Sequence, residues 1–152
     1  MLAHPKLRTY RLFKEVLRRE DYLSLIPEYD LRREMARLRT GSSDLRIETG
    51  RWMGAQEVDR LCWVCGQGAI ENEEHFLLEC VSYEDLRKKM LASIRYQTGD
   101  AYGLTDRRDE SRLLLKVLLG LNGVEKRFRP QIIIAVAKYA RRAMIRRMHL
   151  LK

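Results

Sequence analysis

Apolar residues recur every three to four positions along most of this 152-residue chain, which is the period of helices that bury one face. Proline suits the first turn of a helix, and Pro5, Pro27 and Pro130 each begin such a run. Two further runs begin at Ser82, in a potential capping box, and near Thr105. The pattern predicts an all-α fold of roughly five to six helices without an extended sheet.

The expected helices end at residues that stop a helix. The first run continues to about Arg19, and the second ends at Gly41. Residues 41–60 lack the helical period, so we expect a loop with one short strand at Leu45–Glu48. The run that contains Leu113–Leu121 is apolar on almost every side, which predicts the most buried helix.

The three cysteines of the chain and one of its three histidines gather in a single short segment. Cys62, Cys65, His75 and Cys80 have the spacing C-x2-C-x9-H-x4-C. Three thiolates and an imidazole are ligands of tetrahedral zinc in closed structural sites. A disulfide would leave one cysteine over, and a Cys-His catalytic pair would lack a visible third group or oxyanion hole. The spacing therefore favours one structural Zn²⁺ with no open position for a reaction.

Residues near these ligands have expected supporting roles. Asn72 can cap a short helix whose first turn carries Glu73 and Glu74, where carboxylates suit the helix dipole. Trp52 and Trp63 flank the first ligand. An exposed indole is able to stack on a nucleotide base, but we expect both rings to be buried as a cover for the metal site.

The net charge of +9 is uneven along the chain. Residues 62–80 contain four acids and no Lys or Arg, whereas residues 123–152 contain nine basic residues and one acid. In the last helix, Arg147 falls on the apolar side, but four basic residues fall within an arc of about 140°. Such a face is a solvated surface, a site for an anionic membrane, or a nucleic-acid contact. We favour the last and expect phosphate to meet Lys126, Arg127, Arg129, Lys138, Arg141, Arg142 and Arg146.

One stretch of the chain also resembles a known family. The segment RLCWVCGQGAIENEEHFLLECVSYEDLR, preceded by ARLRTGSSDLRIETGRW, is similar to the zinc-binding region at the C-terminal end of LINE-type (non-LTR) retrotransposon reverse transcriptases. The resemblance covers about Met35 to Leu91, with Val81 where the family often has proline. It implies a role in holding template RNA or target DNA during target-primed reverse transcription, beside the polymerase part of a parent element.

These observations lead to one functional expectation and one main alternative. We expect a non-enzymatic nucleic-acid-binding accessory domain, because no paired-aspartate polymerase motif is visible. The segments would be N-terminal helices in 1–40, a zinc-binding module with the following helix in 41–97, and C-terminal helices in 98–152, packed as one domain. The alternative is a zinc-stabilised module for protein interaction or dimerisation. With no secretory signal or membrane span in the sequence, we expect an intracellular, nuclear location.

Overall fold

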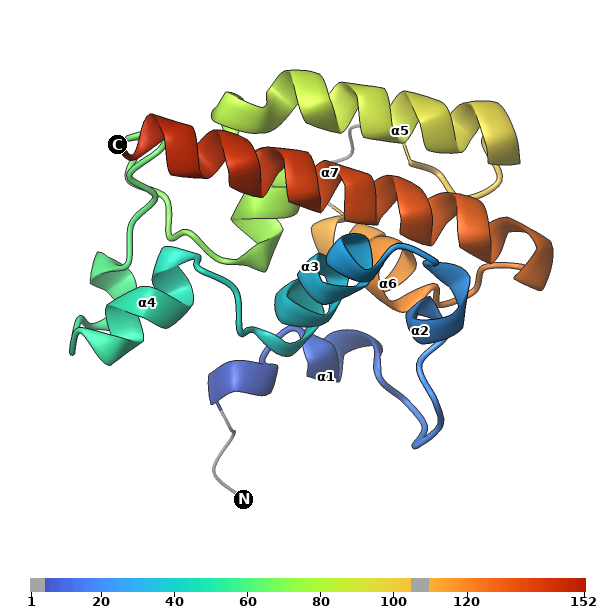
Figure 1. The fold of residues 1–152 in the computed structure, drawn as a ribbon, viewed down its shortest axis with the longest axis horizontal. Helices are drawn as coiled ribbons and strands as arrows, with labels where there is room; N and C mark the ends of the chain where they lie inside the picture. Colours follow the sequence, from blue (N-terminus) through green and yellow to red (C-terminus); the bar gives the residue numbers. More distant parts are fainter. Residues whose placement is uncertain (1–4, 105–109) are drawn as a thin grey trace.

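The computed structural model describes residues 5–104 and 110–152, which are built from helices around a long C-terminal one (Figure 1). This helix, α7 (Arg129–Leu150), packs against α3 (Tyr29–Thr40) and α5 (Glu84–Thr98). Within the described ranges there is no strand, and the one β-bridge is isolated. The predicted all-α fold is therefore confirmed. The buried face of α7 comprises Ile132, Ile133, Val136, Ala137, Tyr139, Ala140, Ala143, Met144 and Arg147.

The N-terminal run forms short helices instead of the single helix predicted to reach Arg19. These are η1 (Pro5–Leu7) and α1 (Tyr10–Phe13), and α2 (Tyr22–Leu25) follows after a loop. The Phe13 carbonyl, which would continue a helix, instead accepts a hydrogen bond from Asn122 Nδ2 at 3.2 Å. Helix α1 is thereby tied to the end of α6 (Ser111–Gly120), and the apolar residues after it, Val16 and Leu17, are exposed.

Helix α3, which is the second helix expected from the sequence, ends at Gly41 as predicted. Gly41 follows α3 with a φ of 69°, a left-handed conformation that favours glycine. A Cβ atom at this position would lie 2.2 Å from the carbonyl oxygen of Lys6, so the close approach of the N-terminal segment also requires glycine. This turn directs the chain from α3 towards the cysteine-containing segment.

The predicted strand at Leu45–Glu48 is wrong, because the chain forms helix α4 (Arg46–Trp52) there. Contacts with distant residues hold this helix. The carboxylate of Glu71 accepts the backbone N–H of Arg46 at 2.7 Å, and the Arg60 guanidinium donates to the Ile47 carbonyl at 3.0 Å. The Arg60 side chain also crosses Gly50 so closely that a Cβ there would lie 2.6 Å from Arg60 Cγ.

Two further expectations need correction. Ser82 does not cap α5, because its hydroxyl donates to the Val64 carbonyl at 3.4 Å and η4 (Val81–Tyr83) precedes the helix. Helix α6 is not buried on every side, since Leu113 is exposed. The start predicted near Thr105 lies outside the described residues. None of the described helices is long and apolar enough to cross a membrane.

Candidate metal centre and the charged residues around it

The four residues predicted as metal ligands lie together at one end of the molecule. Cys62 and Cys65 lie on the loop after η2 (Glu57–Asp59), whereas His75 begins η3 (His75–Glu79) and Cys80 follows it. Their ligand atoms all lie within 4.8 Å of one another, and Cys65 Sγ is 3.5 Å from His75 Nε2. Tetrahedral coordination with ordinary bond lengths separates ligand atoms by roughly 3.5 to 3.8 Å. The cluster is able to hold one metal ion.

Local hydrogen bonds bring the two halves of the cluster together. In the first half, the Cys62 N–H donates to the Ala69 carbonyl at 2.7 Å, and the Gly66 N–H donates back to the Cys62 carbonyl at 3.2 Å. Gly66 has a φ of 62°, which this tight turn requires. In the second half, η3 is a π-helical turn in which the Cys80 N–H donates to the His75 carbonyl at 2.7 Å. The wider turn returns Cys80 towards the histidine.

Asn72 has the capping role that its position predicts. Its side-chain oxygen accepts the backbone N–H of His75 at 2.8 Å, and its carbonyl accepts the N–H of Phe76 at 2.9 Å. The first turn after Asn72 is therefore fixed at the residue that carries the imidazole. Because the ring nitrogen Nε2 faces the thiols, Nδ1 points away from them and lies 3.5 Å from Glu79 Oε2. A carboxylate in this position can orient a metal-bound imidazole.

The close approach of the thiols perturbs their protonation. The hydrogen bond with Cys80, together with burial, raises the pKa of Cys62 to about 12, and the same contact lowers the pKa of Cys80. Desolvation lowers the pKa of His75, but Cys62 and Glu79 raise it by more, so the net direction is upward. A bound cation would displace the protons of these groups, since metal ligands must be deprotonated.

Two of the four acids of the segment Leu61–Cys80, which we call the finger, are buried, whereas Glu74 is half-buried and Glu79 is exposed. Glu71 is buried and receives two hydrogen bonds from Arg147, at 2.7 and 2.8 Å. The sequence pattern placed Arg147 on the apolar side of the last helix without revealing this partner. Glu71 Oε1 also lies 3.9 Å from Cys62 Sγ, so one carboxylate connects α7 with the ligand cluster.

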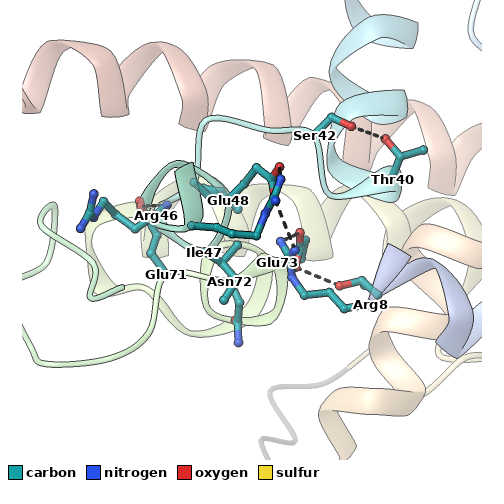
Figure 2. Close-up of polar contacts among 12 residues, drawn as sticks. Arg8, Thr40, Ser42, Arg46, Ile47, Glu48, Glu71, Asn72 and Glu73 are labelled. Carbon is teal, nitrogen blue, oxygen red and sulfur yellow. Dashed lines mark hydrogen bonds and ion pairs between the residues drawn. The ribbon is translucent and has the colours of Figure 1, made fainter. Parts of the chain in front are cut away.

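A second buried acid ties the finger to the N-terminus. Glu73 accepts hydrogen bonds from Arg8 Nε at 3.1 Å and from the Thr9 hydroxyl at 2.9 Å. Figure 2 shows Glu73 beside Arg8, with Glu48 of α4 on the other side of the guanidinium. Arg8 also lies 4.0 Å from the carboxylate of Glu48, while Arg51 donates to the same carboxylate at 2.6 Å. Three carboxylates near the finger are therefore neutralised internally.

The predicted burial of the tryptophans is wrong. Trp52 is 61% exposed and Trp63 is 58% exposed. The apolar support of the finger comes instead from Phe76, whose ring makes edge contacts with Tyr83 and Tyr139 at centroid distances of 5.3 and 5.8 Å. The Tyr139 hydroxyl donates to the Phe76 carbonyl at 2.5 Å, which fixes the finger on α7. The sequence does not reveal this arrangement, because Tyr139 is far from the finger along the chain.

The seven basic residues predicted to contact phosphate have different environments. Four of them form ion pairs within the fold: Arg127 with Glu125, Arg129 with Asp21, Arg141 with Glu34, and Arg146 with Asp85. The other three, Lys126, Lys138 and Arg142, are exposed and have no ion pair with another described residue. The last helix therefore presents fewer available cations than its sequence suggests.

Two of these exposed cations, Lys138 and Arg142, line a shallow cavity between α5 and α7 together with a third, Lys89. Lys138 and Arg142 line it from α7, and Lys89 and Ser93 line it from α5, around a volume of about 90 Å³. Lys89 is exposed and forms no ion pair with any described residue. It is not among the phosphate contacts predicted from the sequence, because it lies on α5 and outside the basic C-terminal segment. We call Lys89, Lys138 and Arg142 the basic groove.

Comparison with known proteins finds no protein-family model, curated protein or solved structure that matches this chain. The function must therefore be inferred from the metal cluster, the basic groove and the exposed aromatic side chains.

Proposed function

We propose that the protein is a nucleic-acid-binding domain in which one structural zinc ion holds the finger and the basic groove contacts phosphate. The observation that carries the proposal is the basic groove: Lys89, Lys138 and Arg142 are exposed side by side without an acidic partner among the described residues. Unpaired cations on neighbouring helices favour a polyanion, because each phosphate contact releases a counterion from the nucleic acid.

The ligand set supports zinc as the metal. Three thiolates and one imidazole form a closed donor set that zinc takes in structural sites, and four protein ligands leave no position for water or substrate. A bound zinc ion would hold the Cys62–Cys65 turn against η3, and Glu79 would orient the His75 ring. We therefore assign the metal a structural role and propose no enzymatic activity.

The internal pairing of two of the four finger acids reduces the repulsion that a polyanionic partner would meet. An acidic segment next to the basic helix would repel phosphate if its carboxylates faced solvent. Glu71 and Glu73 are instead buried against Arg147 and Arg8. The exposed cations of α7 consequently act on a partner with little opposition from these two acids.

The resemblance to LINE-type reverse transcriptases gives this proposal a biological setting. It would make the domain an accessory part that holds template RNA or target DNA in the nucleus, next to the polymerase of a parent element. The basic groove supplies a sequence-independent contact that suits such a holding role, since phosphate contacts position a nucleic acid without reading its bases.

The salt dependence of binding tests the proposal. Three phosphate contacts predict a slope of log affinity against log salt of about −2 to −3, since each contributes about −0.9 on duplex DNA and about −0.7 on single strands. The variant Lys89→Gln/Lys138→Gln/Arg142→Gln should lose most of this slope in fluorescence anisotropy titrations, and its zinc content should not change.

A matched control separates local contacts from net charge. The variant Arg18→Gln/Arg95→Gln/Arg112→Gln loses the same three charges at exposed positions outside the basic groove. It should keep most of the affinity and the slope of the parent protein. Equal binding by the groove variant and the parent at every salt concentration would contradict the proposal.

One observation favours the alternative of a protein-interaction or dimerisation module. Met148, Leu150 and Leu151 are exposed at the end of α7, and a cavity of about 420 Å³ beside α5 is lined by apolar residues such as Leu78 and Leu91 together with charged ones. Apolar association would be nearly independent of salt. Sedimentation of the protein alone at low and high salt distinguishes the two functions, because only the module would self-associate equally in both.

A further inference from the structure

Trp63 is exposed, yet its ring is held in a fixed position by an arginine. The Arg46 guanidinium carbon lies 3.7 Å from the centroid of the Trp63 ring, which is a stacking distance. Arg46 belongs to α4 and Trp63 lies between two candidate metal ligands in the sequence, so the contact joins α4 to the finger. Because one face of the indole is covered by the cation, the exposed part of the ring is presented to solvent in a single orientation.

Arg46 itself lacks the acceptors that a buried guanidinium normally has. The residue is only 6% exposed, its Nε has no hydrogen-bond partner, and it forms no ion pair with the described residues. Its Nη1 has only a weak contact with Met53 Sδ at 3.5 Å. Figure 2 shows the guanidinium pointing away from Glu48 and Glu73.

Glu71, the acid that contacts the backbone of Arg46, is already engaged. Glu71 accepts the backbone N–H of Arg46, but its two oxygens receive the guanidinium of Arg147. Leaving a buried cation without an acceptor costs free energy, and an external ligand with acceptor atoms would supply the missing one. The unpaired guanidinium therefore points to a ligand with acceptor oxygens.

The surroundings of Arg46 narrow the choice of ligand. Trp52 and Met53, at the end of α4, are exposed like Trp63. We call Arg46, Trp52, Met53 and Trp63 the tryptophan patch. Exposed indoles provide flat apolar surfaces, and each π-face is complementary to an unpaired nucleobase, whose carbonyl oxygens would accept hydrogen bonds from the guanidinium.

The other charged residues near the tryptophan patch favour contact with the bases of a nucleic acid over contact with its phosphate backbone. Arg51 is neutralised by Glu48, and Arg60 donates to backbone carbonyls, so neither is available for phosphate. The exposed acids Glu57 and Asp59 on η2 would repel a phosphate chain that ran across them. A strand would therefore follow the basic groove with its phosphates and reach the tryptophan patch with bases.

We propose that the tryptophan patch binds unpaired nucleobases, so that the preferred ligand is single-stranded RNA or DNA. This inference rests on the proposed function, because the basic groove must first attract the strand. A duplex keeps its bases stacked on one another and is unable to offer them to Trp63. The fixed Arg46–Trp63 stack reduces the conformational freedom that is lost when a base binds.

Intrinsic fluorescence tests the inference directly, since Trp52 and Trp63 are the only two tryptophans of the chain. In the Trp52→Phe variant all tryptophan emission comes from Trp63. Single-stranded oligothymidylate should quench this emission, whereas an abasic oligomer of the same length should bind through phosphates without quenching. Replacing Trp63 with Leu should weaken oligothymidylate binding about tenfold and leave abasic binding unchanged.

Arg46→Met supplies a second variant that separates binding from folding. Removing an unpaired buried cation should not lower the melting temperature, but it should weaken oligothymidylate binding. If the abasic oligomer and oligothymidylate bind the parent and Trp63→Leu equally, without quenching, the tryptophan patch does not bind bases and the proposed function stands. If neither oligomer binds the parent at low salt, the proposed function fails and this inference fails with it.

Discussion

The finger and the helical layer of α3, α5 and α7 are neighbours, but different forces hold them. The layer buries a continuous apolar surface, in which Ile132, Ile133 and Val136 of α7 are fully buried. The finger contributes few large apolar side chains and relies on its ligand cluster and on buried carboxylates such as Glu71. Apolar burial is tolerant of small shifts, whereas ligand sets and ion pairs require defined geometry.

This difference implies that each region has its own vulnerability. The layer should resist the loss of any single polar contact, because its stability is spread over many apolar ones. The finger should fail when one ligand or one buried charge is removed. Arg147 of α7 donates to Glu71 of the finger and so connects the two regions. We call this expected contrast between the two regions the division.

The largest effect is expected from removal of the metal. Metal binding supplies roughly 10–16 kcal/mol of apparent free energy in small structural zinc modules, so chelation or Cys80→Ser should unfold the finger. Hydrogen exchange should show loss of protection at the Phe76 and Cys80 amides, which are bonded within the finger. Amides of α7 near Ile133 should stay protected. Uniform loss of protection over both regions would contradict the division.

The second effect concerns the ion pair between the two regions. Arg147→Met leaves Glu71 buried and unpaired, which should lower the free energy of unfolding by about 3–5 kcal/mol. Urea denaturation measures this loss. The double variant Glu71→Gln/Arg147→Met should recover part of it, because no uncompensated charge remains.

Arg142→Met is the matched control for this pair. Arg142 lies on the same helix, is exposed, and has no ion pair with a described residue. Its replacement should change the free energy of unfolding by no more than about 0.5 kcal/mol. A similar loss in both variants would mean that the Arg147–Glu71 pair has no special role in stability.

The same division explains which parts of the fold were predictable from the sequence. Helices α3 and α7 carry their own apolar period and begin near prolines, so local pattern identified them. Helix α4 contains weak helix formers, including Thr49 and Gly50, and depends on Glu71 and Arg60 from elsewhere in the chain. The local sequence of α4 contains no sign of these contacts with Glu71 and Arg60.

The candidate site divides in the same way. The four candidate metal ligands lie within one short segment, where their spacing alone predicts the cluster, and the structure confirms that they gather. The partner of Arg147 is 76 residues away, so only its position on the apolar side of the helix hinted at a role. The predicted burial of the tryptophans is wrong because Phe76 packs against Tyr83 and Tyr139 and supplies the apolar support in their place.

The smallest effect is expected from an exposed pair outside the finger. Arg146 donates to Asp85 Oδ2 at 2.9 Å and connects α7 with the start of α5. The hydrogen bond from Arg146 lowers the pKa of Asp85 to about 2. The ionised carboxylate therefore favours the folded state, and the contribution is complete above the unfolded-state pKa of about 3.9.

As the pH falls from about 4 to about 2, Asp85 becomes protonated and this contribution is lost. Asp85→Asn should therefore lower the melting temperature slightly at neutral pH, and its difference from the parent should disappear towards pH 2. Added salt should reduce the neutral-pH difference as well, because both side chains are accessible to screening ions. A difference that persists in acid would show that Asp85 acts through its size or its hydrogen bonds, independently of its charge.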